Sequence, residues 1–207
     1  GCGKSTTASL LMRFCDAAAG HIYMDGKDYH SMKPEELRKH IAMVPQQVNL
    51  FSGTIRENLL LADPDADDQT LMEAVKEAGL LKFVQSLEKG LNSDVGNAGA
   101  SLSGGQRQKI GIARALLSKA EYMIFDEATS SVDPESEKEI WETIGHLAHT
   151  RTLIIISHRM SSVRGADCIY VLKDGRVAQQ GDHETLMAQD GLYHELVIRQ
   201  QAMEVAE

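Results

Sequence analysis

Short apolar runs and helically spaced apolar residues alternate along this chain of 207 residues. Runs of four or five apolar residues are typical of buried strands in parallel sheets, whereas apolar residues three and four apart are typical of helices. Strands that alternate with helices favour an α/β fold with a mainly parallel sheet. We predict strands at residues 41–45, 122–125 and 152–156, and helices at residues 7–14, 70–78, 80–87 and 107–117.

Two hairpins and a C-terminal pair of helices complete the predicted elements. The first hairpin spans residues 20–27 with a turn at Asp25–Gly26, and the second spans residues 168–180. From Asp182 on, apolar residues at helical spacing predict two amphipathic helices. Their apolar faces are built on Leu186, Leu192, Tyr193, Leu196 and Val197.

Size, charge and cysteine usage narrow the class of protein. The chain is 43% hydrophobic, enough for one substantial core in a single folding unit. No stretch of the sequence approaches the roughly 18 consecutive apolar residues that cross a bilayer. A net charge of −9 argues against a nucleic-acid groove. Three scattered cysteines fit reduced thiols in a cytosolic setting.

The segment GCGKST, residues 1–6, has the composition of a phosphate-binding loop. Gly1 and Gly3 would let backbone N–H groups approach phosphate oxygens closely. Lys4 would reach the β- and γ-phosphates, and the Ser5 hydroxyl would ligate Mg²⁺. Because the following residues have helical spacing, the phosphates would lie at a helix N-terminus, which favours anions. The alternative is a loop with an ordinary surface lysine.

Further polar groups follow two of the predicted strands. Asp126 and Glu127 follow the strand at residues 122–125, at the carboxyl end where open α/β sheets bind ligands. Asp126 is suited to hold Mg²⁺, and Glu127 to orient and polarise an attacking water. His158 follows the strand at residues 152–156, so we expect it beside Glu127, facing the γ-phosphate. The alternatives are a solvated acidic turn and a structural histidine.

The segment LSGGQ, residues 102–106, precedes the helix predicted at residues 107–117. Ser103, Gly104 and Gly105 would leave backbone amides free at the start of that helix. The segment therefore predicts a second anion-binding helix N-terminus. The alternative is a flexible Ser/Gly turn.

The set of motifs is completed by VPQQVNLF, which contains Gln46, and by SSVD at residues 130–133. In this order, and over essentially the whole chain, the motifs resemble the nucleotide-binding domain of an ABC transporter. The resemblance implies a P-loop NTPase (RecA-like) α/β core with a mainly parallel sheet and an inserted α-helical subdomain that carries LSGGQ. We expect a single domain, residues 1–207, with the RecA-like lobe at residues 1–48 and 118–207 and the helical subdomain at residues 49–117.

The resemblance also implies the cofactors and the site residues. We expect ATP and Mg²⁺, with ATP shared between two domains, because LSGGQ in this family binds the γ-phosphate of ATP held by the opposite subunit. The catalytic residues would be Glu127, His158, Lys4 and Gln46. The ATP contacts would be Gly1, Cys2, Gly3, Lys4, Ser5, Thr6, Ser103, Gly104, Gly105, Gln106 and Asp133. The Mg²⁺ ligands would be Ser5, Gln46 and Asp126.

Two segments resemble exporters rather than importers: LFSGTIREN at residues 50–58 and DEATSSVD at residues 126–133. The resemblance therefore implies an ATP-binding and ATP-hydrolysing domain of an ABC exporter that dimerises head-to-tail around two ATP·Mg²⁺. Its expected partners are a second nucleotide-binding domain, in a homodimer or a heterodimer, and a membrane domain with coupling helices encoded upstream, and no nucleic acid. Its expected place is the cytoplasmic face of the plasma or inner membrane. Asn97 stands where many exporters carry a glutamate that contacts a coupling helix, which puts that contact in question.

A soluble ATPase of the same superfamily, not coupled to transport, is the alternative. A chromosome-maintenance ATPase would carry long coiled-coil heptads between Gln46 and LSGGQ, and the sequence has none there. A translation-type protein would carry two LSGGQ signatures in one chain, and this sequence has one.

Overall fold

The structure is a computed structural model that describes residues 2–130 and 132–204. Gly1, one of the predicted ATP contacts, lies outside the described residues.

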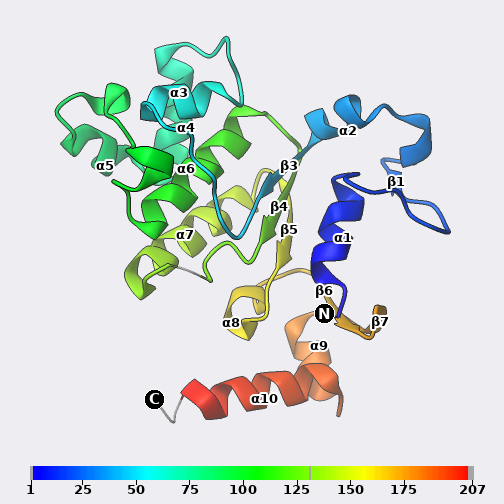
Figure 1. The fold of residues 1–207 in the computed structure, drawn as a ribbon. Coiled ribbons are helices and arrows are strands. Elements are labelled where there is room, and N and C mark those ends of the chain that lie inside the picture. The colour runs from blue at the N-terminus through cyan, green and yellow to red at the C-terminus, as the bar shows by residue number, and fades with distance from the viewer. Residues whose placement is uncertain (1, 131, 205–207) are drawn as a thin grey trace.

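Three parallel strands form the central sheet (Figure 1). They are β3 (Ile41–Val44), β4 (Tyr122–Asp126) and β5 (Thr152–Ile156), with β4 in the middle. Because both pairs of strands are parallel, their carboxyl ends lie at the same edge of the sheet. The predicted α/β fold with a parallel sheet is confirmed, and the apolar runs predicted each of the three strands.

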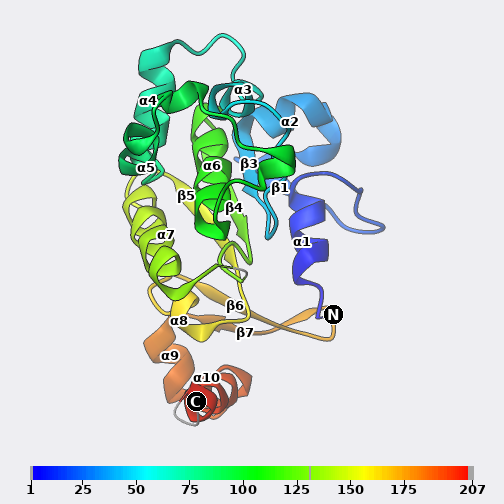
Figure 2. The same ribbon diagram turned by 60° about the vertical axis from the view of Figure 1, so that its left-hand side comes forward.

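Two layers of helices cover the opposite faces of the sheet: α6 (Gly104–Leu117) and α7 (Pro134–Leu147) on one face, α1 (Lys4–Leu11) and α2 (Pro34–His40) on the other (Figures 1 and 2). Met123 and Phe125 of β4 belong to the hydrophobic cluster that contains α6 and α7. Ile124, between them, belongs to the cluster that contains α1 and α2. This alternation is what the pleat of a strand requires.

A run of short helices connects β3 to α6: α3 (Ile55–Leu60), α4 (Asp68–Glu77), α5 (Leu81–Ser86) and the 3₁₀ turns η2 (Gly90–Asn92) and η3 (Asn97–Gly99). Both α3 and α4 pack against α6, and they share the hydrophobic cluster of α6 and α7. The apolar pattern did not predict α3, which starts at a capping box between Thr54 and Glu57. The division into a RecA-like lobe and a helical subdomain stays a prediction.

Both predicted hairpins form antiparallel pairs: β1 (Tyr23–Met24) with β2 (Lys27–Asp28), and β6 (Ile169–Lys173) with β7 (Arg176–Gly181). Asp25 has a φ of 50° and Gly26 a φ of 76°. Two positive φ values are what a two-residue type I′ hairpin turn requires, as the Asp-Gly pair predicted. The 3₁₀ turn η1 (Tyr29–Ser31) follows β2 directly.

The chain ends in α9 (His183–Ala188) and α10 (Leu192–Glu204), which pack with β6 and β7 around a third hydrophobic cluster. Tyr193 and Val197 of α10 are buried in this cluster. Leu196 is 37% exposed, so its predicted place in the apolar face is wrong. The helix α10 contacts α9 and β7, and its buried residues Tyr193 and Val197 lie one helical turn apart.

Among residues 2–130 and 132–204, no helix combines the length and the apolar character that a membrane span needs.

Candidate functional site

The predicted phosphate loop leads directly into α1. Gly3 precedes the helix with a φ of 102°, a left-handed value that glycine adopts without strain. The helix begins at Lys4, and Ser5 and Thr6 are exposed in its first turn. The first N–H groups of a helix have no carbonyl partner within it, and they favour an anion. The segment therefore has the geometry that the prediction of a phosphate site requires.

The strand β4 ends in two adjacent carboxylates, Asp126 and Glu127. Glu127 has a φ of 49°, a left-handed value that is uncommon for residues other than glycine. Its backbone N–H donates to the carbonyl oxygen of Ile156 at 2.8 Å, which fixes this turn to the end of β5. Backbone strain of about 1–3 kcal/mol persists only where the surroundings impose it, and it clusters at functional sites.

Asp126 lies in a site that disfavours its charge. Burial raises the pKa of Asp126 above its ordinary value, and the charge of Glu127 raises it further. The charge of the Lys4 ammonium acts in the opposite direction and lowers the pKa of Asp126 in part. The charge of Asp126 is thus partly compensated by Lys4, and a divalent cation would add to this compensation.

His158 lies beside Glu127, as expected from the strand ends. The distance between His158 Nδ1 and Glu127 Oε1 is 3.1 Å. The histidine side chain is 58% exposed and the glutamate side chain 23% exposed, so the pair faces outward. A hollow of about 10 Å³, lined by both residues and by Trp141, adjoins them. A hollow of this size is close to the smallest that holds one water.

Gln46 reaches the same edge of the sheet from the loop after β3. Its Nε2 donates to the hydroxyl oxygen of Ser130 at 2.9 Å. Because Ser130 lies three residues after Glu127, this bond joins the Gln46 loop to the segment that carries the acidic pair.

Glu137 in α7 was not predicted from the sequence as part of the site. It joins the segment that contains Thr129 to the segment that contains Arg159. Its carboxylate pairs with the guanidinium of Arg159 and accepts hydrogen bonds from Thr129 Oγ1 at 3.0 Å and from Trp141 Nε1 at 3.4 Å. Burial by itself would raise the pKa of Glu137, but the hydrogen bonds from Arg159 and Thr129 outweigh burial and hold the pKa below its ordinary value. Arg159 adjoins His158, so Glu137 ties the histidine segment to α7.

The LSGGQ segment starts α6 with a capping box. The Ser103 hydroxyl accepts from the backbone N–H of Gln106 at 3.1 Å, and the Gln106 amide oxygen accepts from the backbone N–H of Ser103 at 2.9 Å. This box moves the start of the helix from the predicted residue 107 to Gly104. Gly105 is buried, and a Cβ on it would lie 2.5 Å from the Cβ of Ser136 in α7.

Asp133 caps α7 on its own chain. Its carboxylate accepts from the backbone N–H of Ser136 at 2.9 Å, and the hydrogen bonds from Ser136 hold the pKa of Asp133 below its ordinary value. Both Asp133 and Gln106 have hydrogen-bond partners within the chain. Their roles as ATP contacts stay predictions.

The predicted residues therefore fall into two groups. In the first, His158 lies beside Glu127, the charge of Lys4 acts on Asp126, and Gln46 is bonded to Ser130 in the segment that follows the acidic pair. The second lies at the start of α6 and α7, with LSGGQ and Asp133. The helix α1, which carries Lys4, and the helix α6, which carries LSGGQ, cover opposite faces of the sheet.

Comparison with known sequences identifies the family. Residues 1–130, more than half of the chain, match the sequence family described as ABC transporter. The chain belongs to the ABC transporter family. Its resemblance to exporters, drawn from the motifs, is confirmed by the ABC transporters to which it is similar.

Three curated members of the ABC transporter family illustrate this similarity. The chain is 46% identical over 198 residues to the ABC-type transporter kk1G of Curvularia clavata, a match that covers 95% of the chain and 15% of kk1G. It is 43% identical over 196 residues to the ATP-dependent lipid A-core flippase 1 of Colwellia psychrerythraea, covering 95% of the chain and 33% of the flippase. It is 46% identical over 200 residues to the multidrug resistance protein pgp-1 of Caenorhabditis elegans, covering 97% of the chain and 15% of pgp-1.

A solved ABC transporter has the same fold. The chain superimposes on the structure of a bacterial Atm1-family ABC exporter with ATP bound, with a TM-score of 0.90 and 40% identity. The match covers 96% of the chain and 35% of the exporter chain. The chain thus spans about a third or less of the length of the transporters it matches.

Proposed function

We propose that the chain is the ATP-binding and ATP-hydrolysing domain of an ABC exporter. The observation that carries the proposal is the pairing of Glu127 with His158 at the carboxyl ends of β4 and β5, next to Asp126, whose pKa is lowered in part by the charge of Lys4. Family membership supports it, as do the flippase described as ATP-dependent and the exporter structure with ATP bound.

In this proposal the start of α1 binds the phosphates of ATP. Backbone N–H groups after Gly3 and the Lys4 ammonium would neutralise phosphate charge. Ser5, Gln46 and Asp126 would hold Mg²⁺, and their hydroxyl, amide and carboxylate oxygens are the hard ligands that this ion prefers. Without a cation, burial and the charge of Glu127 raise the pKa of Asp126 and so disfavour its ionised form. A divalent cation bound there would favour the ionised carboxylate. When bound, Mg²⁺ would offset the charge of the β- and γ-phosphates.

Hydrolysis would then depend on the Glu127–His158 pair. The Glu127 carboxylate would accept a hydrogen bond from the attacking water and orient it, and the hollow beside it has room for about one water. His158 would steady the γ-phosphate as negative charge develops on it. Glu127 would thus position the water and His158 the γ-phosphate, both at the same edge of the sheet.

A second domain would complete the site. The start of α6 is a helix N-terminus that favours an anion, but α6 and α1 lie on opposite faces of the sheet. LSGGQ is therefore better placed to meet a phosphate held by another copy than the phosphate held by its own chain. We propose a head-to-tail dimer in which Ser103 and Gly105 of one domain complete the site that contains Lys4 of the other.

A membrane domain is the further partner that we propose. A groove of about 310 Å³ lies between β3 and α6, with Val48, Gly111 and Ala115 in its lining. Its mostly apolar wall suits a helix of such a partner. Asn97, whose Oδ1 accepts from Ser52 at 3.3 Å, would not supply the acidic contact of many exporters. The domain would then work at the cytoplasmic face of the plasma or inner membrane.

Replacing Glu127 tests the catalytic part of the proposal. We expect Glu127→Gln in the whole protein to bind ATP like the parent and to hydrolyse it at least about 10²-fold more slowly, because the amide cannot act as a base. ATP should also hold this variant in the closed dimer, which would be detected as ATP that stays bound to the protein through gel filtration. Glu88→Gln, an exposed glutamate elsewhere, is the matched control. Hydrolysis by Glu127→Gln at the parental rate would show that Glu127 is not the base.

The reading frame that encodes the chain tests the transport part. Several neighbouring apolar spans of about 20 residues each would support an exporter. A second LSGGQ cassette without such spans would support the alternative, a soluble ATPase of the same superfamily, and would leave the catalytic proposal intact.

A further inference from the structure

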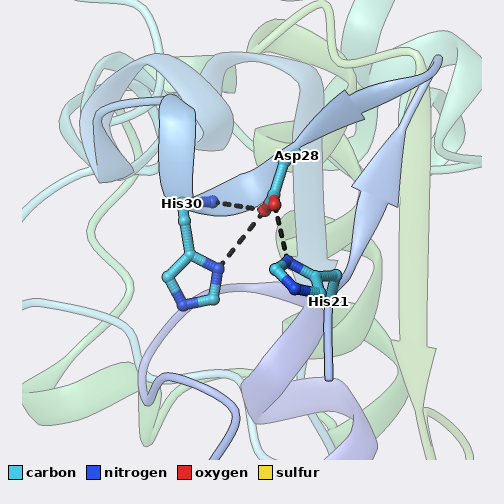
Figure 3. A group of neighbouring side chains, drawn as sticks. All are labelled: His21, Asp28 and His30. Carbon is cyan, nitrogen blue, oxygen red and sulfur yellow. Dashed lines mark hydrogen bonds and ion pairs between the residues drawn. The ribbon is translucent and has the colours of Figure 1, made fainter. Parts of the chain in front are cut away.

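Two histidines and an aspartate converge at the β1–β2 hairpin, away from the acidic pair (Figure 3). His21 precedes β1, Asp28 ends β2, and His30 lies in η1. One potential ligand atom from each side chain lies within 4.8 Å of the other two. Figure 3 shows both imidazole rings turned toward the carboxylate of Asp28.

The distances within this group approach those of a metal site. His21 Nδ1 lies 2.7 Å from Asp28 Oδ2, and His30 Nδ1 lies 3.3 Å from Asp28 Oδ1. Bonds of about 2.0–2.1 Å in a tetrahedral zinc site place neighbouring ligand atoms about 3.3 Å apart. Small side-chain rotations would therefore bring the three ligand atoms to coordination distance.

The backbone that carries these side chains is held in place from several sides. The backbone N–H of His30 donates to Asp28 Oδ1 at 2.9 Å and fixes one carboxylate oxygen. Tyr29, between the two ligands, is buried, and its backbone carbonyl accepts from Arg13 Nη1 at 2.7 Å. The hairpin turn is fixed to β4 by the Tyr122 hydroxyl, which donates to Asp25 at 2.6 Å. Because the hairpin is held by these hydrogen bonds, it loses little conformational entropy when it binds a ligand.

The donor set selects a class of metal. Two imidazoles and one carboxylate suit zinc and similar transition-metal dications, whereas Mg²⁺ and Ca²⁺ prefer oxygen ligands throughout. Both Nδ1 atoms face the carboxylate, so a metal bound to them would leave each Nε2 to carry the proton of its ring.

We propose that His21, Asp28 and His30 bind one zinc-class dication, with a fourth position open to water. The proposal is independent of the ATP site and of transport. The metal would join the segment before β1 to the segment after β2, and so close the hairpin at its open end. A cation bound to the folded state and not to the unfolded chain stabilises the fold by mass action.

Titration of the chain with Zn²⁺ against a chromophoric chelator tests the site, in buffer without nucleotide. We expect one equivalent of Zn²⁺ to bind to the parent, and His21→Gln or His30→Gln to weaken that binding at least tenfold. His149→Gln, which removes an exposed histidine elsewhere, should bind Zn²⁺ like the parent. Zn²⁺ should also raise the melting temperature of the parent and of His149→Gln, but not that of His21→Gln or His30→Gln.

Substitution by Co²⁺ separates this site from zinc held by the three cysteines. We expect the visible absorption of a nitrogen and oxygen ligand set, without the intense thiolate bands that cysteine ligands would give. Equal Zn²⁺ affinity and stoichiometry in the parent and in the His21→Gln/His30→Gln double variant would overturn the proposal. So would a parent that binds no Zn²⁺, in which case the three side chains form a hydrogen-bonded cluster alone.

Discussion

The charge of Asp126 has opposite effects on the proposed Mg²⁺ binding and on the stability of the empty fold. Its folded-state pKa lies above the ordinary value of 3.8, because burial and the charge of Glu127 disfavour ionisation. The fold therefore binds this proton more tightly than the unfolded chain does. The stability linked to Asp126 is fully present below the ordinary pKa and is lost as pH rises through the raised pKa. At neutral pH without a cation, the ionised carboxylate destabilises the fold.

Neutralising Asp126 should consequently stabilise the empty domain. We expect Asp126→Asn to raise the melting temperature at pH 7 in the presence of a chelator, and we expect the gain to disappear near about pH 3, below the ordinary aspartate pKa. The variant should also lose Mg²⁺-dependent ATP hydrolysis, as sites that trade stability for function do. Asp190→Asn, an exposed aspartate, is the control. A neutral or lower melting temperature for Asp126→Asn at pH 7 would contradict the argument.

Elements meet at the site through residues that the sequence pattern does not single out. The apolar runs predicted β4 and β5, and the polar residues after them predicted Asp126, Glu127 and His158. The pattern could not predict the pairing of Glu137 with Arg159, because the two residues lie on different elements and each looks like an ordinary surface charge. Nor could it predict the left-handed backbone of Glu127, which depends on the hydrogen bond to β5.

The Glu137–Arg159 pair should position the histidine segment. We expect Glu137→Gln to lower the free energy of unfolding by about 1–3 kcal/mol, because Arg159 loses a charged hydrogen-bond partner. We also expect it to lower kcat for ATP more than it changes KM, since His158 adjoins Arg159. Glu142→Gln, an exposed glutamate on the same helix, should change neither. A Glu137→Gln variant that is destabilised but keeps the parental kcat would assign the pair to the fold alone.

The helices α6 and α7 lie close together at Gly105 and Ser136. A Cβ on Gly105 would lie 2.5 Å from both the Cβ and the Oγ of Ser136. We expect Gly105→Ala to lower the free energy of unfolding by about 1–3 kcal/mol through overpacking. Ser136→Gly in the same chain should recover part of this loss, a coupling that a double-mutant cycle in urea would measure. Additive effects of the two substitutions would contradict a contact at this point.

At the scale of the whole molecule, the two helices whose starts are predicted to bind anions, α1 and α6, lie on different faces of one sheet. The glycines in the sequence predicted an anion-binding start for each helix. The relative position of α1 and α6 could not be predicted in this way, because it depends on the order of the strands and on which residues of each strand face which helices. This arrangement is the reason for the proposed head-to-tail dimer.

Complementation between two inactive variants tests that dimer. Lys4→Ala removes the phosphate-loop lysine, and Gly104→Asp places a carboxylate at the start of α6 that suits the helix but repels phosphate. We expect each variant to be inactive alone in the whole protein. In a random mixture half of the dimers hold both copies and have one intact site of two, so about a quarter of the ATPase activity should return. Mixtures that stay inactive would argue against sites shared between copies.

The contact between the phosphate loop and the turn of the β6–β7 hairpin has a consequence for how the protein is made. A Cβ on Gly3 would lie 3.7 Å from the Cα of Gly175, so these distant residues are neighbours in the folded chain. At about 5–20 residues per second, a ribosome reaches Gly175 roughly 10–30 s after Gly3. The nascent phosphate loop therefore waits about that long for this neighbour. A nucleotide bound at the proposed site would accordingly meet the complete contact only after both segments are made, and would then stabilise the folded chain.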